Sequence, residues 1–385
     1  MQNLYHTPMK ITYASFDEVP SFKAASTHIL ANCRLAMRQH DLLLLSLGEE
    51  ALPPIAGFSH APAAIRERNY LRRGEAFRSY VHRHLLASRP DVFHFRTPWE
   101  GLLASRLKLA NVYEVNGLPS IELPYHYRNA SPQVLAVLRS WEQACVEQAD
   151  AIVCPSGRIK HCLLNRYAIP DPTRITVIPN GYDPVDWQPA QAVTLPLKAV
   201  YLGTLSAWQG ILWAIKGFSQ LRGQFTLDIY GTAARNLAHY AEKRIIRHGL
   251  EDHVRLHGPL HRADLNRHLS HYHVGLAPLL KTERNADQGC CPVKVMDYLN
   301  HGLVAVAPDL AVIRAMLENG NNGILYQPNC LNSLVSTLQG LAGQAERIPV
   351  LSGNARASLA RFPTWDECSA RMLEVYRQIA RKASK

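Results

Sequence analysis

Short apolar runs alternate along the chain with longer segments whose apolar residues recur every three or four positions. In the first half, the short runs predict strands over residues 10–15, 41–47, 91–95, 111–115, 151–155 and 175–179. The longer segments predict helices near residues 26–39, 63–88, 99–109, 131–148 and 156–166. Alternation of this kind predicts a parallel sheet that is covered by helices on both faces.

The alternation stops at residues 183–196 and then restarts. This stretch, DPVDWQPAQAVTLP, carries three prolines and no helical period, so we expect a linker there. Beyond it, strands are predicted at residues 199–203, 226–231, 254–258, 274–278, 304–308 and 323–326. Helices are predicted near residues 209–221, 234–248, 261–270, 292–301, 310–318, 331–343, 350–360 and 364–381.

The length of 385 residues favours two domains, because roughly 100–200 residues per domain is usual. We therefore predict two Rossmann-like, doubly wound α/β domains in tandem. Open sheets of this class bind ligands at the carboxyl ends of their strands. If two such sheets face each other, the cleft between them is the default binding site.

The composition is that of a folded protein, with 47% hydrophobic and 19% charged residues, and the formal net charge is +11. The densest basic stretch is residues 66–84, where Phe77, Val81 and Leu85 recur every four positions and predict an amphipathic helix. A solvated surface helix and docking on an anionic membrane both explain this stretch. We expect no nucleic-acid partner, because no nucleic-acid-binding motif accompanies the charge.

The apolar runs, such as residues 41–47, are far shorter than the roughly 20 residues that a membrane span needs. The first 16 residues contain no continuous apolar segment typical of a signal peptide. The eight cysteines show no paired metal-ligand spacing. These features favour a cytoplasmic protein with reduced thiols, and we expect no bound metal.

One segment resembles a known signature. Residues 292–309, PVKVMDYLNHGLVAVAPD, resemble the donor-binding helix of family 4 (group 1) retaining glycosyltransferases, which have the GT-B fold. Residues 177–183 (VIPNGYD), 199–210 (AVYLGTLSAWQG) and 362–367 (FPTWDE) are similar to three further segments of that family, in the expected order. The resemblance therefore covers nearly the whole chain.

The resemblance implies the domain limits and the reaction. Residues 1–183 would form an acceptor-side domain, 184–196 a linker and 197–362 the nucleotide-sugar domain, and 363–385 would form a helix that packs back on the first domain. Family members move a sugar from a nucleoside-diphosphate donor to a glycan or lipid-linked acceptor, retain the anomeric configuration and need no metal or permanent cofactor. We expect a role in bacterial polysaccharide or glycolipid biosynthesis. Peripheral contact with the inner face of the membrane is one alternative for such an enzyme.

The resemblance places the donor at the start of the helix near residue 292. A helix N-terminus offers free N–H groups and a positive dipole, which suit a diphosphate. Asp297 would accept hydrogen bonds from ribose hydroxyls, and Lys294, one turn earlier on the same face, would contact a phosphate. The other donor-binding residues that it implies are Gly203, Thr204, Gln209, Gly231, Arg284, Pro292 and Val293.

Several positions differ from the family pattern. The first of two usual glutamates falls on Gly289, and the second is Asp297, which is one methylene shorter. The usual Arg and Lys after the first strand of the second domain fall on Thr204 and Gln209. Other residues must then supply the charge that a diphosphate needs. The alternatives nearby are Lys294, Arg284 and Lys216 for the cations, and Glu283 or Gln288 for the missing glutamate.

The catalytic position also differs. The His that many members place near the sugar falls on Asn116, which hydrogen-bonds a hydroxyl but does not shuttle a proton at neutral pH. His94 and Arg96 end the preceding strand and are expected in the same crevice, although a core position for His94 remains open. We therefore expect Asn116, His94 and Lys294 to act in catalysis.

The acceptor side is expected to come from two segments of the first domain. Residues 16–28 resemble the loop after the first strand, with alanines where family members often carry glycine. Residues 117–127 follow Asn116. The acceptor-side residues that these segments provide are Ser21, Lys23, Ala24, Ala25, Ser26, Glu122 and His126.

Two other functions remain open. A GT-B sugar-nucleotide epimerase would need acid and base groups and no acceptor. A non-catalytic homologue would bind nucleotide-sugar without turnover, and the loss of the usual Glu, Arg and Lys is compatible with it.

Overall fold

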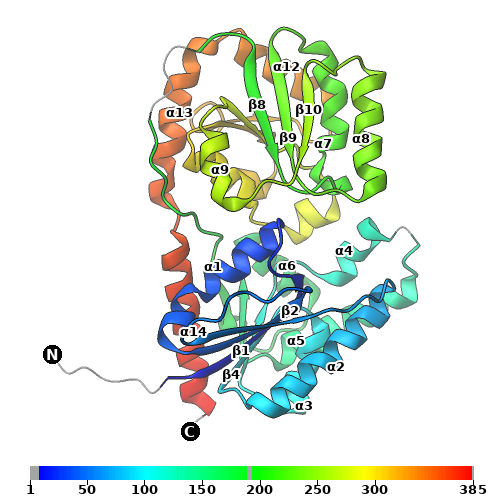
Figure 1. The fold of residues 1–385 in the computed structure, drawn as a ribbon, viewed down its shortest axis with the longest axis vertical. Helices are drawn as coiled ribbons and strands as arrows, with labels where there is room; N and C mark the ends of the chain where they lie inside the picture. Colours follow the sequence, from blue (N-terminus) through cyan, green and yellow to red (C-terminus); the bar gives the residue numbers. More distant parts are fainter. Residues whose placement is uncertain (1–7, 128, 189–192, 384–385) are drawn as a thin grey trace, which may run out of the picture. The chain divides into compact units, whose positions relative to one another are not determined.

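The computed structural model describes residues 8–127, 129–188 and 193–383. These residues form two compact units, one of residues 8–21, 25–179 and 365–383 and the other of residues 22–24 and 180–364. Each unit contains one parallel sheet with helices on both of its faces (Figure 1). The prediction of two doubly wound α/β units is confirmed.

The sheet of the first unit has seven parallel strands in the order β3-β2-β1-β4-β5-β6-β7. The direction of winding changes between the neighbours β1 and β4, where doubly wound sheets open a crevice at their carboxyl edge. The strands are β1 (Lys10–Glu18), β2 (Asp41–Leu47), β3 (Phe58–Ala63), β4 (Val92–Phe95), β5 (Asn111–Glu114), β6 (Ala151–Cys154) and β7 (Ile175–Val177).

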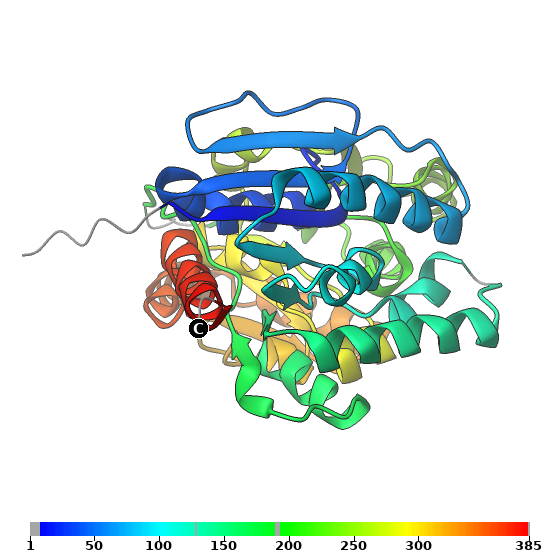
Figure 2. The same cartoon turned by 90° about the horizontal axis from the view of Figure 1, so that it is seen from below.

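Two layers of helices bury this sheet. One face packs on α1 and α14, and the other packs mainly on α2, α3, α5 and α6. Figure 2 shows α14 beside the first unit, to which the contacts also assign it. The helices are α1 (Ala24–Gln39), α2 (Tyr70–Ser88), α3 (Pro98–Arg106), α4 (Pro119–His126), α5 (Pro132–Gln148), α6 (Gly157–Arg166) and α14 (Trp365–Ala383).

The C-terminal helix α14 therefore packs back on the first unit, as the resemblance implied. Its residues Trp365, Met372 and Tyr376 are buried against the face of the sheet that α1 also covers. Ser369 fixes the two helices to each other, since its hydroxyl donates to the carbonyl of Asn32 at 2.9 Å and accepts from the N–H of Leu35 at 3.0 Å.

The sequence pattern missed two elements of the first unit. The strand β3, FSHAPA, contains Pro62 and pairs only with β2, and an edge strand tolerates a proline because one side needs no ladder hydrogen bond. The helix α4 contains Pro124 in its interior, which masks its period. The prediction of a helix from residue 63 was wrong at its start, because Asn69 caps α2 by accepting from the N–H groups of Leu71 and Arg72.

The second unit has six parallel strands in the order β10-β9-β8-β11-β12-β13. The strands are β8 (Leu197–Leu202), β9 (Phe225–Tyr230), β10 (Val254–Gly258), β11 (Val274–Leu276), β12 (Val304–Pro308) and β13 (Gly323–Tyr326). The helices are α7 (Ile211–Ala214), α8 (Arg235–Arg247), α9 (Arg262–Leu269), α10 (Val293–Asn300), α11 (Ala311–Arg314), α12 (Leu331–Ala342) and α13 (Ile348–Ala357). The helix predicted near residues 209–221 is broken into short pieces, of which α7 is the α-helical one.

The helix α10 is fixed to the sheet by a buried tyrosine. Strand β8 extends past its neighbour β11, which pairs with it only at Ala199 and Val200. The Tyr298 hydroxyl accepts from the N–H of Leu202 at 3.0 Å and donates to the carbonyl of Leu276 at 3.0 Å. It thereby replaces ladder bonds that the two strands do not make with each other. The ring lies directly on Gly275, where a Cβ atom would overlap with it.

The ends of α10 are held by the segment that follows β7. Asn180 donates to the carbonyl of Cys291, just ahead of the helix, at 2.6 Å. At the other end Asn300 donates to the carbonyl of Asp183 at 2.7 Å. The beginning of the expected linker therefore lies against α10, while residues 189–192 of that linker are outside the described residues.

Removal of the Tyr298 hydroxyl tests this attachment. Tyr298→Phe leaves the N–H of Leu202 without its partner, and we expect a loss of about 1–3 kcal/mol in the free energy of unfolding. The matched control is Tyr326→Phe, because the buried Tyr326 hydroxyl has no hydrogen-bond partner among the described residues. Denaturant titrations of both variants check the prediction, and an equal or larger loss in Tyr326→Phe would contradict it.

Candidate functional site

In the second unit, α10 begins at the carboxyl edge of the sheet with an uncapped N-terminus. Pro292 is its N-cap residue and makes no side-chain cap hydrogen bond to the first turn. The first N–H groups of a helix have no partner within the helix and carry the positive end of its dipole. The N–H groups of Val293 and Lys294 lie in this first turn and are therefore suited to an anion.

Lys294 is buried at this helix start. Its Nζ lies 4.0 Å from the centre of the Tyr201 ring and donates to Oε1 of Gln209 at 2.7 Å. The same ammonium lies against Gly203, where a Cβ atom would be 3.1 Å from Nζ. Three residues predicted at the donor site, Gly203, Gln209 and Lys294, are therefore brought together.

The environment of Lys294 lowers the pKa of its ammonium to about 7. Burial is the main cause, and the positive charge of Arg284 adds to it, whereas Cys290 acts in the opposite direction. The contacts that the side chain makes, to an aromatic face and an amide oxygen, carry no full negative charge. A bound anion would supply the counter-charge that the site lacks.

Glycines allow the strand ends beside Lys294 to lie close together. Gly203 has a φ of +131°, and a Cβ atom on Gly231 would overlap with the Gly203 carbonyl oxygen. The N–H of Gly231 in turn donates to the carbonyl of Gly258 at 2.7 Å. Thr204, which takes the place of the usual Arg, accepts from the Tyr201 hydroxyl through its backbone carbonyl at 2.6 Å.

Asp297 has a cationic partner that the sequence analysis missed. Its Oδ1 lies 2.7 Å from Nη1 of Arg262, at the start of α9. The Asp297 side chain is buried, and that of Arg262 is partly exposed. Arg262 therefore orients the carboxylate that was predicted to contact ribose. Little in the sequence indicates this role for Arg262, because an isolated Arg in a loop is common on protein surfaces.

Arg284 lies in a single π-helical turn, Glu283–Gln288. Such turns are rare and occur frequently at functional sites. The guanidinium lies 5.3 Å from the Trp208 ring and donates to Oδ1 of Asn285 at 3.0 Å. Of the two residues considered for the missing glutamate, Gln288 is buried and Glu283 is exposed.

In the first unit, a buried carboxylate that the sequence analysis did not select lies at the end of β5. Glu114 is 1% exposed and is surrounded by donors from β1, α1 and β4. Oε1 lies 2.5 Å from Nε2 of His28, and Oε2 accepts from the Tyr13 hydroxyl at 2.6 Å and lies 2.9 Å from Nε2 of His94. Burial alone would raise the pKa of Glu114, but His28, Arg96 and these hydrogen bonds hold it well below its usual value.

The predicted catalytic residues of this unit both contact Glu114. The Asn116 amide donates to Oε1 of Glu114, and the side chain of Asn116 is only partly buried. His94 is completely buried, stacks on Tyr13 with ring centres 4.0 Å apart, and has its Nδ1 2.6 Å from the Tyr376 hydroxyl of α14. Burial lowers the pKa of His94, against the effect of Glu114. In this position His94 is enclosed by protein and contacts Glu114, the Tyr376 hydroxyl and the Tyr13 ring.

Arg96 lies beside the same carboxylate. Its Nε is 3.9 Å from Oε1 of Glu114 and 3.7 Å from Oδ2 of Asp17. Nη1 is buried and has no hydrogen-bond partner among the described residues. A buried guanidinium nitrogen without a partner is unusual and is a candidate contact for a ligand oxygen.

The predicted acceptor-side residues come from the segments that follow β1 and β5, and of these Lys23 and Ala24 are grouped with the second unit. The N–H of Ser21 donates to Oγ of the buried Ser26 at 3.1 Å, while Lys23 and Ala24 are exposed and Ala25 is partly exposed. Further along, the carboxylate of Glu122 lies directly against Gly117. His126 is exposed at the end of α4.

The described residues contain neither a metal cluster nor a membrane-spanning helix. Within residues 8–127, 129–188 and 193–383, no group of three or more His, Cys, Asp or Glu side chains is placed to hold a metal ion. None of the helices in these ranges is long and apolar enough to cross a bilayer.

Comparison with known proteins identifies the family. Residues 25–186 match the model of Glycosyltransferase Family 4, and residues 196–344 match that of Glycosyl transferases group 1. D-inositol 3-phosphate glycosyltransferase of Xylanimonas cellulosilytica is 23% identical over 258 residues, which are 63% of this chain. The match spans 60% of the length of that curated relative.

Solved structures agree on the fold. Sucrose-phosphate synthase from Thermosynechococcus elongatus superposes with a TM-score of 0.78 at 15% identity, over 98% of this chain and all of the other. Anabaena HepE in complex with UDP-glucose gives 0.73 at 16% identity, over 98% and 99%. WaaG, a glycosyltransferase involved in lipopolysaccharide biosynthesis, gives 0.75 at 14% identity, over 95% and 99%. With the family models covering most of its length, this chain belongs to the family 4, group 1 glycosyltransferases of the GT-B fold.

Proposed function

We propose that this protein transfers a sugar from a nucleoside-diphosphate donor to a glycan or lipid-linked acceptor, with retention of the anomeric configuration and without a metal. The observation that carries the proposal is Lys294, a buried ammonium beside a helix start whose N-cap residue offers no side-chain cap. Among the described residues its contacts are the Tyr201 ring and the Gln209 amide oxygen, and it makes no ion pair to a carboxylate. That arrangement suits the diphosphate of the donor. UDP and UDP-glucose in the complexes of the similar Anabaena HepE support this class of ligand.

The residues then have separate roles. The N–H groups of Val293 and Lys294, together with the Lys294 ammonium, stabilise the negative charge that develops on the leaving diphosphate. Asp297, oriented by Arg262, accepts hydrogen bonds from the ribose hydroxyls. Arg284 raises the local positive potential, and Thr204, Gln209 and Gly231 form the wall beside the phosphates.

In the bond-breaking step, the bond between the anomeric carbon and the β-phosphate oxygen breaks and leaves an oxocarbenium-like sugar. The acceptor hydroxyl attacks the same face, and its proton passes to the departing phosphate oxygen, so no strong protein base is needed. In the first unit Asn116, fixed by Glu114, would hydrogen-bond a sugar hydroxyl, and the unpartnered nitrogen of Arg96 would contact a ligand oxygen.

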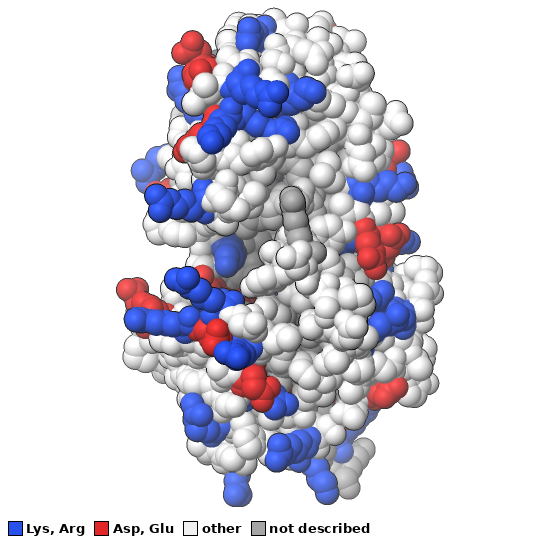
Figure 3. Space-filling model, turned by 90° about the vertical axis from the view of Figure 1, so that its right-hand side faces the viewer, with Lys and Arg blue, Asp and Glu red and all other residues white. Residues whose placement is uncertain are grey.

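We further propose that the protein works at the anionic inner face of the membrane in bacterial polysaccharide or glycolipid synthesis. The amphipathic helix α2 buries Phe77, Val81 and Leu85 and presents basic residues on its other side. Figure 3 shows basic side chains of the first unit mixed with acidic ones, and a larger basic patch on the second unit. Basic residues are thus present on both units, on α2 of the first and on α8 of the second. Substitutions on each helix test which of them contacts the membrane.

Substitutions at the donor site test the activity. A thermal-shift screen of nucleotide-sugars identifies the donor, and transfer or donor hydrolysis is then measured. Lys294→Ala should lower kcat/KM by roughly tenfold or more, and Asp297→Ala should lower donor affinity and turnover together. The matched control Lys243→Ala, an exposed lysine of α8 in the same unit, should retain wild-type rates.

The same assay separates the alternatives. Full transfer activity in both Lys294→Ala and Asp297→Ala would remove these residues from the site. Conversion of the donor to its epimer without acceptor would identify an epimerase, and saturable binding without any turnover would identify a binding homologue. Product stereochemistry by NMR tests retention, and activity in excess chelator tests metal independence.

The lowered pKa of Lys294 predicts proton uptake on binding. The free ammonium loses its proton near pH 7, and a bound diphosphate stabilises the charged form and raises this pKa in the complex. Between the two pKa values, affinity should fall as pH rises above about 7, by up to roughly tenfold per pH unit.

Calorimetry with an intact nucleotide-sugar, in two buffers of different ionisation enthalpy, measures this uptake. The intact donor is chosen because its phosphates do not titrate near pH 7. Lys294→Arg keeps its charge and should give a flat pH profile. A flat profile without proton uptake in the wild-type protein would contradict the assignment of Lys294 to the diphosphate.

Membrane contact is tested by co-sedimentation with vesicles of anionic and neutral lipid. Replacement of Arg72 and Arg83 of α2 by Gln should weaken binding to anionic vesicles roughly tenfold to thirtyfold, at about 1 kcal/mol per basic residue. The control replaces Arg235 and Arg247 of α8 by Gln. A larger loss in the α8 variant, or equal binding to neutral vesicles, would overturn the proposed role of α2.

A further inference from the structure

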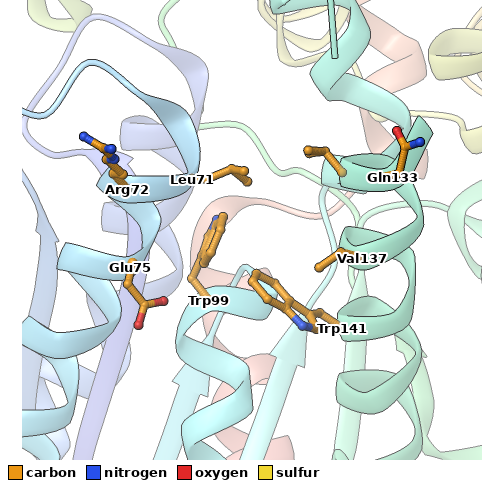
Figure 4. Close-up of a pocket in the computed structure, with 8 residues that line it drawn as sticks. Leu71, Arg72, Glu75, Trp99, Gln133, Val137 and Trp141 are labelled. Carbon is orange, nitrogen blue, oxygen red and sulfur yellow. The ribbon is translucent and has the colours of Figure 1, made fainter. Parts of the chain in front are cut away.

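A cavity of about 400 Å³ opens on the surface of the first unit between α2, α3 and α5. Trp99 and Trp141 pack against each other on one side of it, with ring centres 4.8 Å apart, and Leu71 and Val137 lie on either side of this pair (Figure 4). The polar ends of neighbouring side chains lie at its margin. Val137 is 46% exposed, so the cavity is open to solvent and is not an internal void. Its volume is in the range of small-molecule sites, about 300–1,000 Å³.

The cavity borders both segments that were expected on the acceptor side. Trp99 packs against Phe16, and their ring centres are 6.4 Å apart. Phe16 lies near the end of β1 and is the first residue of the segment 16–28. Leu123 of α4 is buried in the same cluster as Trp99 and Leu138. A ligand in the cavity would therefore lie beside the residues proposed to hold the acceptor.

The lining selects a hydrocarbon. A sugar would bury hydroxyls and a peptide would bury N–H and C=O groups against Trp, Leu and Val side chains, which offer few partners for them. Each unpartnered polar group would weaken binding roughly fivefold to a hundredfold. An alkyl chain gains from the same surface, since burial of apolar area is favourable.

The charge at the margin selects an anionic head group. Three polar residues line the margin: Arg72 and Glu75 from α2 and Gln133 from α5. The Glu75 carboxylate accepts from the Arg78 guanidinium, so its charge is matched on the same helix. Arg72 is exposed at the cavity and leaves the margin net positive, which favours a phosphate over a cationic or neutral head.

We propose that this cavity binds the hydrocarbon chain of a lipid acceptor whose head group is a phosphate or diphosphate. The inference rests on the proposed function, because it names the class of acceptor for that transfer. The chain lies against the packed pair Trp99 and Trp141, between Leu71 and Val137. The phosphate lies near Arg72, and the part that receives the sugar extends toward α4.

Binding of dodecyl phosphate below its micelle concentration tests the proposal by calorimetry on the full chain. One saturable site is expected. Val137→Trp fills the open side of the cavity and should weaken binding roughly tenfold or more, since the buried apolar area of the chain is lost. Val350→Trp is the matched control, an exposed valine of α13 in the other unit, and should bind like wild type.

A second cavity variant and two head-group tests complete the experiment. Gln133→Trp narrows the same cavity from an exposed position and should also weaken binding, so misfolding of one variant does not end the test. For the head group, Arg72→Gln should weaken binding of dodecyl phosphate roughly threefold to tenfold, whereas Arg106→Gln at the end of α3, also an exposed arginine, should not. Decyl maltoside, a neutral amphiphile, should bind more weakly and respond to neither Arg substitution.

The outcomes are distinct. Equal affinity in wild type, Val137→Trp and Gln133→Trp would overturn the cavity as the site, and tighter binding of decyl maltoside would overturn the anionic head group. Nucleotide-sugar binding is measured on the same preparations. If the protein binds dodecyl phosphate but no nucleotide-sugar, the proposed function is contradicted and the lipid site is not. If it binds nucleotide-sugar but not dodecyl phosphate, only the lipid site is contradicted.

Discussion

The attachment of α10 to the second sheet is the constraint on which the donor site depends. The Tyr298 hydroxyl bridges two strand ends, Gly275 lets its ring lie on the sheet, and the residues around Asn180 hold the loop ahead of the helix. A helix held in this way keeps its first N–H groups at one place on the carboxyl edge. Anion binding by such a group costs little reorganisation, because the donors are already oriented before the ligand arrives.

The buried charges of the two units differ in how far their surroundings compensate them. Glu114 is surrounded by a tyrosine, two histidines, an amide and an arginine, so its charge is satisfied and its pKa is held low. Lys294 has an aromatic face and an amide oxygen as partners, and its pKa falls to about 7. The hydrogen bonds around Glu114 hold the surrounding side chains in place. The surroundings of Lys294 leave an incomplete electrostatic environment, which is characteristic of groups that act on ligands.

The sequence predicted the parts of the fold that depend on local pattern. Alternating apolar runs and amphipathic segments were enough for two parallel α/β units, and the resemblance of four segments indicated the family. The strand β3 and helix α4 escaped detection because each carries an interior proline that tertiary position tolerates. Prediction also failed for contacts between distant residues. Arg262 with Asp297, and Tyr13 and His28 with Glu114, meet only because strands and helices far apart in the chain are packed together.

Amide hydrogen exchange with and without the donor identified by screening is the most direct test of the central claim. The account predicts that the nucleotide-sugar slows exchange in the first turn of α10, at residues 293–295, and in the loop at residues 203–209. Strand β6 of the first unit should exchange at an unchanged rate. Protection by the donor elsewhere, with the first turn of α10 exchanging as in the free protein, would contradict the assignment of that helix start to the diphosphate.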